Sequence, residues 1–189
     1  MNYTFKEFLV ETKLPPKLYH LTNLEGMEGI LKTNTLTGKN YTNISTTRDP
    51  TLKNYAGARA IIFRIVLDSE KLSKKYKLKN VIFKSRSGEK FTSEQETEID
   101  VGELGKIVNI DDYIIEIQLI KPELDKLDDL FNPKSNEDYI NRLRLSNTAE
   151  DIIQQEIEND LKYYNNFKDL LDNVIRKIKT ITTLKYIND

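Results

Sequence analysis

The stretch KLYHLTNLEGMEGILKT, residues 17–33, predicts a β-strand that leads directly into an α-helix. Lys17–Leu21 is a short run of β-prone residues. Thr22-Asn23 supplies side-chain oxygens of the kind that cap a helix N-terminus. Leu24–Thr33 then has helical periodicity. The apolar residues on one face of that helix are Met27, Ile30 and Leu31. A strand joined to an amphipathic helix indicates a helix that packs on a sheet.

Ala60–Leu67, AIIFRIVL, is the clearest strand, because nearly all of its residues favour β-structure, and we expect it in the centre of the sheet. Further strands are predicted at Ile44–Thr47, Val81–Phe83, Glu98–Val101, Ile107–Ile110 and Tyr113–Ile120. Short helices are predicted at Tyr3–Thr12 and after the capping pair Asp68-Ser69. This mixture of strands and helices predicts an α+β fold.

The pattern changes at Lys121-Pro122 and is helical from there to the end of the chain. The predicted helices are Glu123–Phe131, Glu137–Leu145 and Thr148–Ile181. We therefore expect a domain at 1–121 and a C-terminal helical region at 122–189. These helices pack on the domain or form an arm for a partner or for self-association.

Composition excludes several classes of protein. The 189 residues contain no cysteine, which excludes disulfide scaffolds and thiolate chemistry, and a single histidine, which excludes a polyhistidine metal centre. The formal net charge of −1 argues against binding duplex nucleic acid by charge alone. These counts lead us to expect a protein without a metal. No apolar run is long enough to span a membrane and no signal peptide is evident, so we expect a cytoplasmic protein.

Three polar stretches lie where strands are predicted, namely Tyr19–Thr22, Ile44–Asp49 and Glu94–Ile99. Each has an ordinary explanation. A lone histidine is commonly a hydrogen-bonded structural residue, a Ser-Thr-Thr run commonly ends a strand, and an acidic cluster is commonly a solvated surface. Their order and spacing, however, favour a common site.

The sequence Leu18-Tyr19-His20-Leu21-Thr22, a helix with Gly29-Ile30-Leu31, then Ser45-Thr46-Thr47-Arg48-Asp49 and Glu96-Thr97-Glu98-Ile99 resembles the ADP-ribosyltransferase superfamily. The resemblance covers about residues 17–120 and is strongest to compact phage and bacterial mono-ADP-ribosyltransferases. One branch of that superfamily has histidine on its first strand, and another has a Glu-x-Glu motif on its third. This chain combines both. The resemblance implies a split mixed β-sheet that binds NAD.

The resemblance also implies roles for individual residues. Glu98 is the expected catalytic carboxylate beside the nicotinamide ribose, where it stabilises developing positive charge, and Glu96 is its partner, which orients the attacking group. The expected NAD-binding residues are His20, Thr22, Ser45, Thr46 and Arg48. Among these, His20 is expected to bond a ribose hydroxyl and Arg48 is a candidate for the pyrophosphate.

The predicted function is transfer of ADP-ribose from NAD to a protein or nucleic-acid target, as in a phage effector that modifies its host or in a bacterial toxin. Two alternatives remain. One is an NAD-dependent RNA 2′-phosphotransferase, which relies on more basic residues. The other is a non-catalytic binding or structural phage protein that retains the fold; such a protein has no reason to retain a carboxylate at Glu98.

Overall fold

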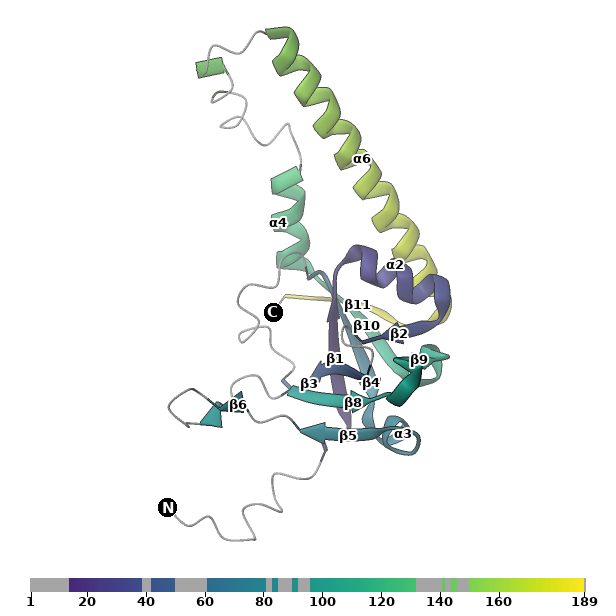
Figure 1. The fold of residues 1–189 in the computed structure, drawn as a ribbon. Helices are drawn as coiled ribbons and strands as arrows, with labels where there is room; N and C mark the ends of the chain where they lie inside the picture. The colour runs from purple at the N-terminus through teal and green to yellow at the C-terminus, as the bar shows by residue number, and fades with distance from the viewer. Residues whose placement is uncertain are drawn as a thin grey trace.

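The computed structural model describes residues 14–38, 42–49, 61–80, 83–84, 90–91, 96–131, 141, 144–145 and 150–188. Its centre is a seven-stranded sheet with the strand order β11-β10-β4-β1-β3-β8-β5 (Figure 1). The strands of this sheet are β1 (Lys17–Thr22), β3 (Asn43–Thr47), β4 (Phe63–Asp68), β5 (Lys77–Asn80), β8 (Glu96–Asp100), β10 (Ile114–Ile120) and β11 (Leu184–Ile187). The β10–β11 pair is parallel and the others are antiparallel, so the sheet is mixed and the α+β class is confirmed.

Two further pairs of short strands lie outside this sheet. They are β2 (Thr35–Thr37) with β9 (Lys106–Val108), and β6 (Phe83–Lys84) with β7 (Lys90–Phe91). The helical elements are α2 (Leu24–Thr33), α3 (Ser69–Ser73), α4 (Lys121–Phe131), α6 (Glu150–Ile181), and the 3₁₀ turns η1 (Gly102–Leu104) and η2 (Ile110–Tyr113).

The predicted β1–α2 unit is confirmed. The Asn23 side chain accepts a hydrogen bond from the Gly26 amide at 2.8 Å and caps α2. Asn34 ends the helix in the left-handed conformation, with φ of 51°. Such a backbone suits asparagine better than most residues with a Cβ. Helix α2 therefore begins after Asn23 and ends before Asn34, the two residues that cap it.

The strand β4 is central, as predicted, because it pairs with β1 on one side and β10 on the other. The capping prediction at Asp68 also holds, since its carboxylate accepts the Lys71 amide at 3.0 Å at the start of α3. The prediction at Ile107–Ile110 is only half right. Lys106–Val108 forms β9, but Asn109 has φ of 53° and turns the chain into η2.

Helices α2 and α6 cover one face of the sheet. Their buried side chains belong to the same apolar cluster as those of the alternate residues on β1, β4 and β10. The members from the two helices are Leu24, Met27, Ile30, Leu171, Val174 and Ile178, and those from the three strands include Leu18, Phe63, Ile65, Leu67, Ile117 and Leu119. Strand alternation therefore directs the remaining residues of these strands to the opposite face.

The C-terminal region was expected to be helical to its end, and this expectation is wrong at β11. Leu184–Ile187 pairs with β10, with Ile117 opposite Leu184. The edge of β10 presents unpaired backbone groups that an adjacent extended segment satisfies. Helix α6 itself is confirmed and packs on α2. The predicted helix at Tyr3–Thr12 and most of Glu137–Leu145 lie outside the described residues.

Within the described residues, every helix is too short or too polar to cross a membrane.

Candidate active site

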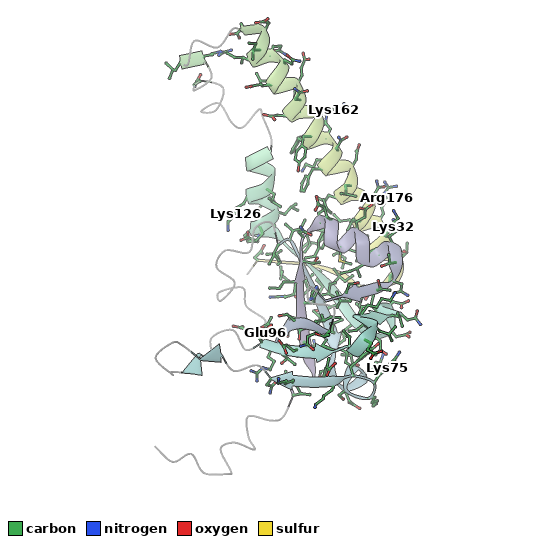
Figure 2. The ribbon with its side chains drawn as sticks, viewed as in Figure 1. Lys32, Lys75, Glu96, Lys126, Lys162 and Arg176 are labelled. Atoms are coloured by element: carbon green, nitrogen blue, oxygen red, sulfur yellow. The ribbon has the colours of Figure 1, made fainter. Side chains whose placement is uncertain are left out.

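The Glu-x-Glu motif lies on β8, the strand next to β3. The register places Glu98 opposite Ser45 and Glu96 opposite Thr47. Directly opposed residues in an antiparallel pair have their side chains on the same face, so both glutamates lie on one face of the sheet. Thr97, between them, is fully buried on the other face. The two carboxylates are therefore adjacent, as the spacing predicts; Glu96 stands where β8 begins, at the margin of the sheet (Figure 2).

Side chains of β3 hold both carboxylates. The Ser45 hydroxyl donates a short hydrogen bond to Glu96 Oε1. The Asn43 amide donates to Glu98 Oε2 at 3.2 Å. Hydrogen bonds to an ionised carboxylate are stronger than those between neutral groups and fix its orientation. Each glutamate is thus held by one donor from the neighbouring strand.

His20 lies at the junction where β1 and β3 diverge. In the described structure these two strands are in register only at Tyr19 and Thr47. One residue further along β1, His20 Nδ1 lies 3.1 Å from the backbone oxygen of Ser45. Because a carbonyl oxygen only accepts, Nδ1 carries the proton of this bond. The ring therefore bridges the two strands and leaves Nε2 as an acceptor.

Burial lowers the pKa of His20 below its usual 6.5, and the hydrogen bond to the Ser45 carbonyl opposes that effect in part. The ring is accordingly neutral at pH 7. A neutral imidazole with Nδ1 committed to a carbonyl presents Nε2 to a hydroxyl group. This is the protonation state that binding a sugar hydroxyl requires.

Thr22 and Thr46 both lie on the face of the sheet opposite the carboxylates. The Thr22 hydroxyl lies against Gly26 so closely that a Cβ at position 26 would come within 2.1 Å of it, so only glycine fits there while Thr22 keeps this position. Thr46 is 1% exposed, and its hydroxyl donates to the Thr97 carbonyl at 2.7 Å. Both threonines lie beside residues of the site; Thr46 braces the backbone of β8 and does not face the carboxylates.

Arg48 follows directly after β3 and is half-buried. The turn it occupies is closed by the Asp49 amide, which donates to the Thr47 hydroxyl at 3.0 Å. Since Thr47 is opposite Glu96, Arg48 stands at the Glu96 end of the site. Glu94, the first residue of the third polar stretch, lies outside the described residues.

The pairing of the strands places the His20 side chain on one face of the sheet and the two carboxylates on the other. Tyr19, Thr47 and Glu96 are aligned across three strands and share one face. His20 is opposite Ile65, a core residue, on the other face of β1. Its ring contacts the backbone oxygen of Ser45, beside the point where β1 and β3 pair. The site is therefore built at the junction of the strands.

A polar row that the sequence did not predict continues from the carboxylates across the same face. The Arg64 guanidinium lies 5.5 Å from the centre of the Tyr19 ring, and Arg64 Nε donates to Gln118 Oε1 at 2.5 Å. Gln118 in turn donates to Glu116 at 2.5 Å, and Glu116 forms an ion pair with Lys185. These residues alternate with buried apolar residues on β4 and β10, and that alternation is the sequence signal for a polar face.

Asn43, which donates to Glu98, is a further site residue that the sequence did not predict. Its signal is its position two residues before Ser45, which places it on the same face of β3 and opposite Asp100.

Among the described residues no group of three histidine, aspartate or glutamate side chains is arranged to hold a metal ion. No protein-family model, curated protein or solved structure matches this chain.

Proposed function

We propose that the protein is an NAD-dependent mono-ADP-ribosyltransferase. The observation that carries the proposal is the meeting of the three polar stretches at Ser45. Its carbonyl accepts from His20, its hydroxyl donates to Glu96, and it stands opposite Glu98. Three stretches that are far apart in the sequence therefore meet at one residue, which supports a common site.

The chemistry follows from the charges. Breaking the bond between ribose C1′ and the nicotinamide nitrogen sends the electron pair to nicotinamide and builds positive charge on the sugar. Glu98, oriented by Asn43, stabilises this charge and accepts a hydrogen bond from the ribose 2′-hydroxyl. The acceptor's lone pair then forms the new bond to C1′, and Glu96 accepts the acceptor's proton.

His20 and Arg48 have binding roles in this proposal. Nε2 of the neutral His20 ring accepts a hydrogen bond from a ribose hydroxyl of the adenosine half, and Arg48 pairs with the pyrophosphate. Ser45 orients Glu96, and Thr46 holds β8 in register. The acceptor is a protein or a nucleic acid, as for an effector or toxin that modifies cellular targets.

Three variants test the division of roles. Glu98→Gln should lower nicotinamide release at least about a hundredfold while NAD binding, measured by calorimetry, persists. Glu96→Gln should reduce transfer to an acceptor more than it reduces NAD hydrolysis. His20→Ala should mainly weaken NAD binding. Release of nicotinamide by Glu98→Gln at the wild-type rate would show that this glutamate is not the catalytic carboxylate.

A further inference from the structure

A cavity of about 280 Å³ lies between the N-terminus of α2, helix α4 and helix α6. Its apolar lining includes Leu24, Leu127, Phe167 and Leu170. Tyr163 also lines it and is 56% exposed, so the cavity reaches the surface. The volume is below the range of about 300–1,000 Å³ typical of sites for drug-sized ligands, and it suits apolar side chains presented by another chain.

The exposed part of α6 continues from this cavity. Figure 1 shows the helix extending well beyond the sheet, past α4. Its first twelve residues, 150–161, contain five carboxylates and no lysine or arginine. Asp160 is exposed and precedes Tyr163 by three residues, so the two lie on the same side of the helix. On α2, the exposed Glu25 lines the cavity.

The nearest lysines on α4 and α6 point elsewhere. Lys162 is turned about 100° around the helix from Tyr163, and the Lys168 ammonium lies 5.4 Å from the centre of the Tyr164 ring, on another side of the helix. Lys126 lies on the side of α4 away from α6 (Figure 2), where it forms an ion pair with Glu123 at 2.6 Å. The rim of the cavity is therefore acidic and its lining apolar, which complements a segment that carries apolar residues on one side and lysine or arginine beside them.

We propose that this groove, lined by Glu25, Leu127, Tyr163 and Phe167 and flanked along α6 by Asp160, docks a cationic amphipathic helix of another protein. The apolar face of such a helix fills the cavity, and its basic residues face Glu25 and Asp160. The acidic rim repels nucleic-acid phosphates, so the partner is a protein. The docking does not depend on the proposed transfer reaction, because Glu98 lies on β8, an element that does not line the groove.

The test uses the full chain and a fluorescent 14-residue amphipathic helix of leucine and lysine. Fluorescence anisotropy should show saturable binding that Tyr163→Ala or the pair Glu25→Lys and Asp160→Lys weakens about tenfold or more. The pair Asp151→Lys and Glu158→Lys is the matched control, since it makes the same charge change on the opposite side of α6 and should leave the affinity unchanged. Thermal melts of each variant check that it folds.

Several results would overturn the proposal. A scrambled peptide of equal composition that binds as tightly would reduce the effect to charge attraction alone. Equal binding of a leucine-glutamate helix would remove the role of the acidic rim. A wild-type chain that forms dimers through Tyr163 would assign the groove to a second copy. Glu98→Gln should bind the peptide like the wild type even if it abolishes NAD cleavage, so the two proposals fail independently.

Discussion

Ser45 contacts both His20 and Glu96 and so connects the histidine to the carboxylates. Its backbone oxygen fixes the tautomer of His20, while its side chain orients Glu96. A substitution at Ser45 that removes the hydroxyl therefore leaves the bond to His20 intact, because that bond uses the backbone. The histidine and the carboxylates are held by different atoms of one residue.

His20 gives this site a measurable pH dependence. Burial lowers its pKa below 6.5 in the folded protein, so between pH 6.5 and that lower value the unfolded chain binds more protons. Stability should therefore fall as pH decreases through 6.5. His20→Gln keeps an amide donor for the Ser45 carbonyl but cannot titrate. Its melting temperature should change less than that of the wild type between about pH 7 and about pH 5.5.

The measurement is thermal unfolding by circular dichroism across that range. Because His20 is the single histidine of the chain, no other imidazole contributes. Identical slopes of melting temperature against pH for the two proteins would mean that the ring is not buried as a neutral group.

For single residues, the sequence predicts which polar residues belong to the site better than it predicts the face to which each side chain points. The Glu-x-Glu spacing correctly places Glu96 and Glu98 on one face, because alternation is a local property of a strand. It does not predict that Thr46 points away from them, which depends on the register with β8, or that Asn43 contacts Glu98. Contacts between strands depend on a pairing that one strand alone does not specify.

Among the elements, β11 ties the end of the chain to the sheet. Besides its backbone pairing with β10, Lys185 forms an ion pair with the buried Glu116. Burial alone would raise the pKa of Glu116, but hydrogen bonds from Lys185 and Gln118, with the charges of Lys185 and Lys17, outweigh it and hold the pKa below 4.5. Glu116 is therefore ionised. Its charge is balanced by Lys185 of β11, the strand that follows α6.

Lys185→Met should destabilise the protein by about 1–2 kcal/mol, because it leaves a buried carboxylate without its cation. The half-exposed position of Lys185 keeps the effect below that of a fully buried pair. Denaturant unfolding measures the change in free energy. Lys179→Met, which alters an exposed lysine of α6, is the control and should have little effect.

The double variant Glu116→Gln with Lys185→Met should recover part of the loss, since position 116 then carries no buried negative charge that lacks its cation. Equal free energies of unfolding for wild type and Lys185→Met would contradict this account of β11.

The strand β11 was missed because Leu184–Ile187 is four residues long and follows a long helical pattern. Its partner is the outer edge of β10, whose position is not visible in the local sequence. By contrast, the continuous run of β-forming residues predicts β4, and the helical periodicity of a long segment predicts α6.

The whole molecule is organised by the two faces of its sheet. The apolar face is covered by α2 and by the C-terminal half of α6, and the opposite face carries the polar row and the two glutamates. Helix α6 is thus part of the core at its C-terminal end and extends past α4 at the other (Figure 1), where Ile153 is buried and its neighbour Ile152 is exposed. Buried residues of the C-terminal end should therefore contribute more to stability than exposed residues near the N-terminal end.

Two matched substitutions on α6 test that division. Leu171→Ala removes a 4% exposed side chain of the core and should cost about 2–4 kcal/mol. Ile152→Ala alters a side chain that is 47% exposed and should cost less than about 0.5 kcal/mol. The free energies of unfolding are measured in urea. Similar costs at both positions would mean that the helix is uniformly packed or uniformly peripheral.

The α+β class and the central position of β4 follow from the sequence because they rest on periodicity and composition. The strand order does not, since β1, β3 and β8 are separated by long segments and become neighbours only in the folded sheet. This order is nonetheless what places His20, Ser45 and Glu98 together, so the candidate site is a property of the whole fold.

The proposed transfer of ADP-ribose is tested with NAD that carries ³²P in its ADP-ribose half. Wild-type protein, Glu98→Gln and the control Glu103→Gln, an exposed glutamate in η1, are each incubated with a bacterial lysate. Label should appear in protein or nucleic acid with the wild type and Glu103→Gln and should be absent with Glu98→Gln. Transfer by Glu98→Gln at the wild-type rate, or a wild-type protein that neither binds NAD nor releases nicotinamide, would show that the proposed function is wrong.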